Sequence, residues 1–301
     1  MTDKTLSAKK YAIALGFFDG LHKAHKRVLS EAVKKVSSGY TPAVLLFDEH
    51  PRNVISGKKI PFLLQSGIRD AKLREMGLET LFVSFSEIKD MTPEEFVSEI
   101  LVKRFSAGAV VCGFNYAFGK NASGTPEALK RLCMLHEISV TVVDDVTWEG
   151  EDISSTRIRK AVSEGKMEEA AALSGFPFTY ESEIFTGDRR GRLLGAPTVN
   201  QFLPAELIVP RFGVYASRVY AEGKEYIGVT NIGSRPTFDG ESVRSETYIL
   251  DFSGDLYGRA VRIELYKFIR DEKKFPDGDA LKAQIALDVQ SVSRYFGRAD
   301  G

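Results

Sequence analysis

Cysteine is nearly absent from this chain, because only Cys112 and Cys133 occur among its 301 residues. Two thiols are too few for a disulfide framework or a cysteine zinc site, and their apolar neighbours favour small buried side chains in a reducing compartment. Long apolar runs are also lacking: we find neither a membrane-length stretch nor the apolar segment of a signal peptide. We therefore expect a cytoplasmic protein with no membrane partner.

An excess of one charge is lacking as well, since 41 basic residues are balanced by 41 acidic ones. Nucleic-acid binding usually requires a basic surplus, so we expect no nucleic-acid partner, although a local anion site stays open. Hydrophobic residues make up 43% and charged residues 27%, an ordinary composition for a folded globular protein. The length favours two domains, and the sequence identifies neither protein partners nor an oligomeric state.

The first half of the chain alternates short apolar runs with amphipathic segments. This alternation predicts an α/β domain with a parallel sheet and crossover helices. The expected strands are residues 11–15, 43–47, 80–85, 109–112 and 139–143. The expected helices are residues 24–35, residues 69–76, one that starts at the cap residue Thr92, one after Ser155, and residues 166–173.

From about Tyr180 the pattern changes to closely spaced strand-like runs separated by turn residues. Such a pattern predicts an antiparallel barrel or sandwich. The expected strands are residues 182–185, 213–220, 225–232, 247–252 and 259–269, and an amphipathic helix over 279–296 closes the chain. The change of pattern predicts one domain over residues 1–178 and a second over residues 179–301.

A glycine-flanked segment joins the first expected strand to the first expected helix. Its polar and close-approach residues are, in order, Gly16, Phe18, Asp19, Gly20, His22 and His25. A helix N-terminus offers free N–H groups and a positive dipole end, which favour phosphate, and imidazole N–H groups can stabilise developing phosphate charge. The alternative is a plain helix cap with two surface histidines. The two glycines favour phosphate handling.

A second polar constellation, residues 153–159, leads into another expected helix. Ser154, Ser155 and Thr156 supply hydroxyl groups, and Arg157 and Arg159 follow in the first turn. Hydroxyls, free N–H groups and guanidinium groups together suit a polyphosphate. A serine cap with solvated arginines is the alternative interpretation.

Two further segments follow strands of the expected parallel sheet, where ligands of such sheets usually bind. After the fourth strand, Asn115 stands among the aromatic residues Phe114 and Phe118, which could hold a flat ring or pack in the core. His50 follows the second strand, and a lone histidine at a turn is most often structural.

The second half contains a glycine-punctuated basic loop, residues 187–200. Its glycines and first arginine are Gly187, Arg189, Gly191 and Gly195. Backbone N–H groups of such a loop can bind an anion, and Thr198 and Asn200 offer hard oxygen ligands on one side of an extended chain, which suit Mg²⁺. A flexible basic loop is the alternative. Further on, Glu246 begins an apolar run and could accept a proton from a substrate hydroxyl, or could be a charge that protects an edge strand.

The histidine segment and the Ser-Ser-Thr-x-x-Arg segment resemble the nucleotidyltransferase superfamily with a Rossmann-like core. Together with the segment at Asn115 they are similar to the N-terminal module of the bacterial bifunctional riboflavin kinase/FAD synthetases, which adenylylates FMN. The resemblance implies that His22 and His25 stabilise the ATP phosphates and that Ser154, Thr156 and Arg159 bind the triphosphate. It places Asn115 in the substrate pocket.

The Pro-Thr-x-Asn stretch and the strand around Glu246 resemble the riboflavin kinase domain of the same family, a β-barrel with a closing helix. The resemblance implies that Thr198 and Asn200 bind Mg-ATP and that Glu246 is the base. It also implies the substrates and products riboflavin, FMN, FAD and ATP, with Mg²⁺ as the cofactor.

The expected activity is therefore phosphorylation of riboflavin to FMN, followed by adenylylation of FMN to FAD with release of pyrophosphate. Two departures from the family pattern concern the second step. Ala24 stands where the family usually has glycine, and Ala117 replaces the arginine of the Asp-Phe-Arg-Phe-Gly motif. The alternatives are a kinase with a weakened or inactive adenylyltransferase half and a non-catalytic flavin- or nucleotide-binding regulator.

Overall fold

The computed structural model describes residues 9–57, 59–185, 198–237 and 240–298, and it divides into two compact units. The first comprises Met1–Ile60 and Ser66–Ser154, and the second comprises Pro61–Gln65 and Ser155–Gly301. The short segment 61–65 belongs to the second unit because Phe62 donates its N–H to the Glu206 carbonyl and accepts from the Ile208 N–H. The boundary predicted at residue 178 separates two activities, and a division into compact units does not test it. It stays a prediction.

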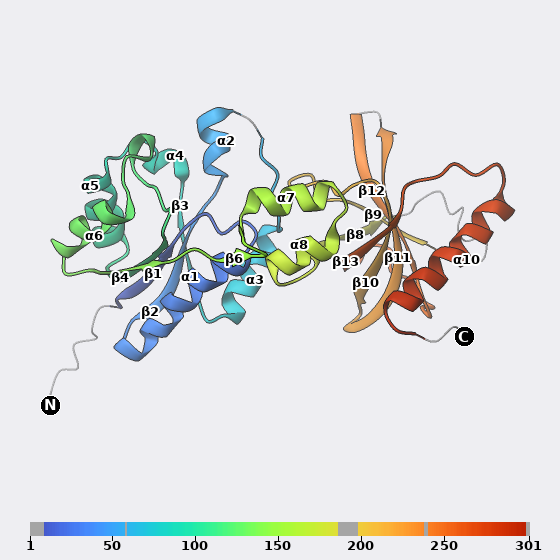
Figure 1. Ribbon diagram of the computed structural model, residues 1–301, viewed down its shortest axis with the longest axis horizontal. Helices are drawn as coiled ribbons and strands as arrows, with labels where there is room; N and C mark the ends of the chain where they lie inside the picture. Colours follow the sequence, from blue (N-terminus) through green and yellow to red (C-terminus); the bar gives the residue numbers. More distant parts are fainter. Residues whose placement is uncertain (1–8, 58, 186–197, 238–239, 299–301) are drawn as a thin grey trace. The chain divides into compact units, whose positions relative to one another are not determined.

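The first unit is a five-stranded parallel sheet with the order β3-β2-β1-β4-β5, flanked by helices (Figure 1). This confirms the predicted α/β fold. Its strands are β1 (Tyr11–Leu15), β2 (Thr41–Phe47), β3 (Glu79–Val83), β4 (Ala107–Gly113) and β5 (Ser139–Val143), with a small hairpin of β6 (Thr147–Trp148) and β7 (Glu151–Asp152). Its helices are α1 (Lys23–Lys34), a 3-10 turn (Lys35–Ser38), α2 (Pro51–Ser56), α3 (Ser66–Glu75), α4 (Phe85–Ile88), α5 (Pro93–Glu95), a π-helical stretch (Phe96–Arg104), a 3-10 turn (Lys120–Ala122) and α6 (Pro126–Met134).

Alternation along the strands divides the core of this sheet between its two faces. Ile13 and Leu15 of β1 pack in one cluster with Phe96, Ile100 and residues of α6. On the opposite face α1 buries Val28, Leu29 and Ala32 and contacts β1, β2 and β4. The helices on both faces leave the carboxyl ends of the strands as the edge where loops can carry a site.

The expected third strand extends too far, since β3 ends at Val83 and Phe85 begins α4. The Asp48 carboxylate causes this early end, because it accepts the Phe85 N–H at 3.0 Å and the Glu49 N–H at 3.0 Å. These hydrogen bonds also lower the pKa of Asp48, against the opposing effect of desolvation. The helix cap expected at Thr92 is confirmed, and the structure adds a capping box: the Thr92 hydroxyl accepts the Glu95 N–H, and the Glu95 carboxylate accepts the Thr92 N–H.

The second unit contains a closed antiparallel barrel with the order β10-β11-β12-β9-β8-β13 and a final helix (Figure 1). The predicted barrel and closing helix are therefore confirmed. The strands are β8 (Phe178–Phe185), β9 (Thr198–Phe202), β10 (Gly213–Ala221), β11 (Lys224–Thr237), β12 (Gly240–Ile249) and β13 (Ala260–Arg270), and the helices are α7 (Ser155–Ser163), α8 (Met167–Ser174) and α10 (Gly278–Tyr295). The strand expected over 247–252 is shifted, because β12 ends at Ile249 and Asp251 adopts a left-handed backbone with φ 56°.

A row of hydroxyl groups fixes strand β12 from inside the barrel. Thr247 bonds to Thr230 at 2.9 Å, and Thr230 bonds to Ser217 at 2.8 Å. Ser245 accepts the Tyr180 hydroxyl at 2.6 Å. All these side chains are buried, and burial raises the pKa of Tyr180 well above its usual value. Because strand residues alternate, the residue between Ser245 and Thr247 is held on the outside of the barrel.

Candidate active sites

The turn after β1 folds back on itself around one aromatic ring. Phe18 has a left-handed backbone with φ 48° and is buried, and its ring covers Gly16 so closely that a Cβ there would lie 2.9 Å from the Phe18 ring. A side chain at position 16 would therefore collide with the Phe18 ring, so this turn requires glycine. The same turn buries Asp19 and brings His22 to the start of α1.

His22 is the N-cap of α1. Its Nδ1 accepts the His25 N–H at 3.3 Å, so the neutral ring carries its proton on Nε2. The two imidazole rings are stacked, with centroids 3.6 Å apart and an interplanar angle of 16°. His22 is only 4% exposed. A plain surface cap is therefore not what the structure shows.

His25 is also neutral, because burial lowers its pKa to about 3. The edge of Phe18 packs on its ring with centroids 5.1 Å apart. Within the described residues, the buried Nδ1 of His25 has no hydrogen-bond partner. Two neutral, stacked imidazoles thus stand at a helix N-terminus with no acidic residue in its first turn, which suits donation to phosphate oxygens.

Two other strand ends contribute to the same edge of the sheet. His50, after β2, is 7% exposed and packs on Phe17 with ring centroids 4.1 Å apart. After β4, Phe118 is buried against Phe96, whereas Phe114 is 47% exposed and Asn115 is exposed. The core-packing interpretation therefore applies to Phe118. Phe114 and Asn115 remain a candidate ring-binding segment.

The hydroxyl-rich constellation lies at the start of α7, where the compact units divide between Ser154 and Ser155. In the second unit, Arg159 donates its Nε to the Pro61 carbonyl at 2.8 Å, and Arg157 lies 3.4 Å from a Glu169 oxygen. Thr156 is exposed at the helix start. The arginines are thus anchored by the protein rather than simply solvated, and the histidine pair belongs to the other unit.

The barrel brings the predicted kinase residues together across neighbouring strands. Glu246 of β12 pairs directly with Asn200 of β9, and on its other side it pairs with Asn231 of β11. Thr198 is two residues before Asn200 and therefore shares its side of β9. β12 has a hydrogen-bonded neighbour on each side, so the edge-strand interpretation of Glu246 is wrong. The predicted loop residues Gly187, Arg189, Gly191 and Gly195 lie outside the described residues.

Sequence reasoning missed the next members of this row. Asn231 donates its Nδ2 to Glu272 Oε1 at 3.1 Å. Within the described ranges, no group of three or more His, Cys, Asp or Glu residues is arranged to hold a metal. Thr198 and Asn200 offer neutral oxygens on one side of β9, and such oxygens together with nucleotide phosphates are a donor set that Mg²⁺ accepts.

The fold defines the class: a nucleotidyltransferase-type α/β unit is combined with a riboflavin-kinase-type barrel in one chain. Models of protein families agree, since the FAD synthetase family matches residues 4–157 and the riboflavin kinase family matches residues 174–296. Among the described residues, no helix has the length and apolar character needed to cross a membrane.

Known relatives cover nearly the whole chain. A bifunctional riboflavin kinase/FMN adenylyltransferase of Listeria monocytogenes is 35% identical, covering 99% of this chain and 96% of its own, and the Bacillus subtilis counterpart is 36% identical over 95% and 93%. A crystal structure described as a macrolide-efflux protein from Streptococcus pneumoniae superposes with a TM-score of 0.86, at 32% identity over 95% of this chain and 94% of that one. The chain belongs to the bifunctional riboflavin kinase/FMN adenylyltransferase family.

Proposed function

We infer that this chain phosphorylates riboflavin to FMN with ATP and then adenylylates FMN to FAD with release of pyrophosphate. The observation that carries the first step is the cross-strand row of Asn200, Glu246 and Asn231 on the outside of the barrel. Membership of a bifunctional family, with a separate family model for each half, supports the second step.

In the kinase step, Glu246 accepts the proton of the riboflavin 5′-hydroxyl group while the oxygen of that hydroxyl group bonds to the γ-phosphorus of ATP. The bond from that phosphorus to the bridging oxygen breaks, and ADP leaves. Thr198 and Asn200 would hold Mg²⁺ together with the phosphates, and the ion offsets their negative charge. The hydroxyl row inside the barrel keeps Glu246 in place, so little reorganisation accompanies proton transfer.

In the adenylyl step, an oxygen of the FMN phosphate attacks the α-phosphorus of ATP, and pyrophosphate leaves. His22 and His25 donate to phosphate oxygens as charge develops there, and both act as neutral donors. His22 presents Nε2–H because its Nδ1 is occupied by the His25 N–H. We assign triphosphate binding to Ser154, Ser155, Thr156 and Arg159, and contact with FMN to Asn115. Gly16, Phe18, Asp19 and Gly20 shape the turn.

A product analysis tests this function directly. The chain is incubated with riboflavin, ATP and Mg²⁺, and FMN and FAD are separated by chromatography. We expect FMN to appear first and FAD to follow. Accumulation of FMN without FAD would identify a kinase with an inactive adenylyltransferase half. This is the second candidate function, and the methyl group of Ala24 in the first turn of α1 is the observation that favours it. If neither product formed, both assignments would be wrong.

A further inference from the structure

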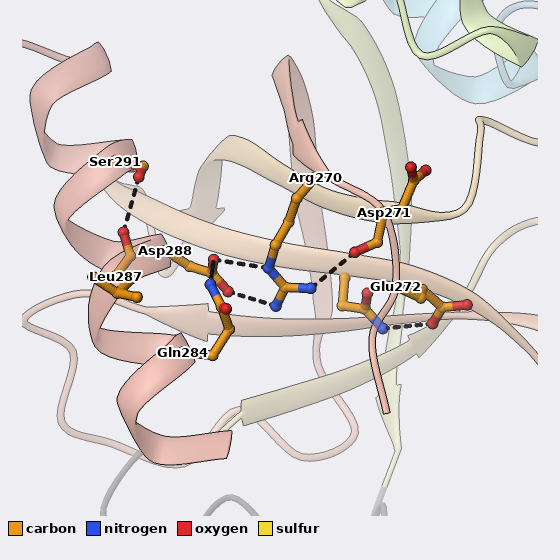
Figure 2. Close-up of polar contacts among 8 residues, drawn as sticks. Arg270, Asp271, Glu272, Gln284, Leu287, Asp288 and Ser291 are labelled. Atoms are coloured by element: carbon orange, nitrogen blue, oxygen red, sulfur yellow. Dashed lines mark hydrogen bonds and ion pairs between the residues drawn. The ribbon is translucent and has the colours of Figure 1, made fainter. Parts of the chain in front are cut away.

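The segment between β13 and α10 lies over the outside of the barrel and carries a glutamate to the kinase row. Figure 2 shows Glu272 on this segment together with Arg270 and Asp288. Glu272 Oε1 accepts from Asn231 Nδ2 at 3.1 Å, and Asn231 pairs in register with Glu246. The row therefore runs from Asn200 through Glu246 and Asn231 to Glu272.

A glycine makes room for this carboxylate. Gly233 is two residues after Asn231 and lies on the same side of β11. A Cβ on Gly233 would lie 2.3 Å from Glu272 Oε1 and 3.0 Å from its carboxyl carbon. The backbone of Gly233 is not left-handed, so an alanine here would meet the Glu272 carboxylate and no backbone strain. A methyl group at this position would therefore displace the carboxylate from its contact with Asn231.

Both ends of the segment are fixed to the barrel and to α10. Arg270 donates twice to the Asp288 carboxylate, at 2.9 and 2.7 Å, and once to the Asp271 carbonyl at 2.9 Å (Figure 2). The side chains of Arg270 and Asp288 are 16% and 4% exposed, which favours a well-defined ion pair. At the other end Asp277 caps α10 by accepting the Ala280 N–H at 2.8 Å. Glu272 is therefore held by short chain connections at both sides.

An amide side chain can turn by 180° with little change in shape, so its partners decide which atom it presents. A carboxylate only accepts hydrogen bonds, so Glu272 requires the nitrogen of Asn231 on its side and directs Oδ1 away from it. We propose that Glu272 is a positioning residue for riboflavin phosphorylation, which fixes the amide of Asn231 beside Glu246. The inference rests on the proposed role of Glu246.

The contact is exposed, and its loss is expected to change stability little. Loss of the contact should instead lower kcat for FMN formation, because Asn231 would then sample both amide orientations next to the reacting groups. We expect Glu272→Ala to lower kcat about tenfold, the scale of one lost charged hydrogen bond, with the KM for ATP unchanged. Glu272→Gln can present either its oxygen or its nitrogen to Asn231, so it no longer selects one amide orientation, and its kcat should fall as that of Glu272→Ala does.

Gly233→Ala supplies an independent way to break the same contact, because its methyl group displaces the carboxylate. It is expected to reproduce the loss seen with Glu272→Ala, and the double variant should be no slower than either single one. Asp271→Ala is the matched control, since Asp271 neighbours Glu272 but pairs with Arg211 at the surface. Adenylylation of supplied FMN, which we assign to the first part of the chain, should be unchanged in each full-length variant.

The experiment measures kcat and KM of riboflavin phosphorylation for these variants and for Glu246→Gln. Losses in Glu272→Ala, Glu272→Gln and Gly233→Ala, with Asp271→Ala close to wild type, support the inference. If Glu246→Gln is slow while Glu272→Ala and Gly233→Ala are as fast as wild type, the inference is overturned and the proposed site stands. A wild-type kcat in Glu272→Gln would also overturn it, because an amide at this position does not select one orientation of Asn231. Wild-type turnover in Glu246→Gln would remove the proposed site itself.

Discussion

Glu246 of β12 and Asn200 of β9 are direct cross-strand partners on the outside of the barrel, although they are 46 positions apart in the sequence. The pairing places the Glu246 carboxylate beside the amide group of Asn200. Hydroxyl contacts inside the barrel hold the strand at the residues before and after Glu246. If Glu246 is the base and Asn200 a metal ligand, as we propose, this pairing places both beside the reacting groups of a phosphoryl transfer.

The first prediction concerns the base. Glu246→Gln keeps the shape of the side chain but removes its capacity to take a proton, so we expect kcat for FMN formation to fall on the order of a hundredfold. The KM for riboflavin should change little, because the interaction lost belongs to the transition state. Steady-state kinetics with riboflavin as the varied substrate measure both values. Glu225→Gln, on the next strand and paired with Arg218, is the control and should behave as wild type.

The second prediction concerns the metal. Thr198→Ala and Asn200→Ala each delete an oxygen that we assign to Mg²⁺. We expect a higher Mg²⁺ concentration for half-maximal FMN formation, about tenfold for one lost ligand. Titration of Mg²⁺ at fixed ATP measures this value. If both variants keep the wild-type Mg²⁺ requirement, these residues do not hold the ion.

The third prediction concerns the histidine pair. His22→Ala or His25→Ala should lower FAD formation from supplied FMN about a hundredfold, as the loss of one donor to a developing charge typically does. FMN formation from riboflavin should continue at the wild-type rate. His136→Ala is a matched control, since His136 is exposed beyond α6 in the same unit. Equal losses of both activities would mean that the pair supports the fold instead.

The fourth prediction follows from the lowered pKa of His25, which is about 3 in the folded chain because of burial. In the unfolded chain His25 has its ordinary pKa near 6.5. Above that pH the residue is neutral in both states, so folding is not opposed by the loss of a proton and its contribution to stability is fully present. Stability should fall as pH drops from about 6.5 towards 3, with this residue contributing about 2 kcal/mol between pH 7.5 and pH 5. Urea denaturation at the two pH values measures the change. His25→Gln should show a smaller loss, and an identical loss would contradict a neutral buried His25.

The fifth prediction concerns the division of activities. A fragment of residues 155–301 includes α7 and α8, whose Met167 and Leu173 are fully buried in the second unit. We expect it to form FMN and no FAD, and to melt at a higher temperature than a fragment of residues 179–301, which lacks these helices. Thermal denaturation and product chromatography compare the two. FAD from either fragment would refute the assignment of adenylyl transfer to the first part of the chain.

Local signals in the sequence were sufficient for most elements. The strands β1 and β5 have the predicted ends, and the helix cap lies at Thr92 as predicted. Helix α6 was missed although its start carries the same signal, because Thr125 caps it and Pro126 is its first residue. Strand β9 was missed for a different reason: its five residues become a strand through pairing with β12 and β8, which no local pattern reveals.

The candidate sites, like the secondary structure, were only partly predictable from local sequence patterns. The glycine and histidine motif is continuous in the sequence, so its residue types alone indicated phosphate chemistry. The stacking of His22 on His25 and the packing of the Phe18 ring on His25 depend on the left-handed backbone of Phe18, and no sequence pattern predicted that conformation. The pairing of Asn231 with Glu272 depends on barrel register and on the path of the chain after β13, so neither residue could be singled out beforehand.

Complementation between two single variants tests most directly the claim that this chain carries two separate active sites. Glu246→Gln and His25→Ala are each incubated with riboflavin, ATP and Mg²⁺, alone and as an equimolar mixture, and FAD is measured by chromatography. The account predicts FMN alone from His25→Ala, little product from Glu246→Gln, and FAD from the mixture, because free FMN made by one variant is adenylylated by the other. A mixture that makes no more FAD than the separate variants would contradict it.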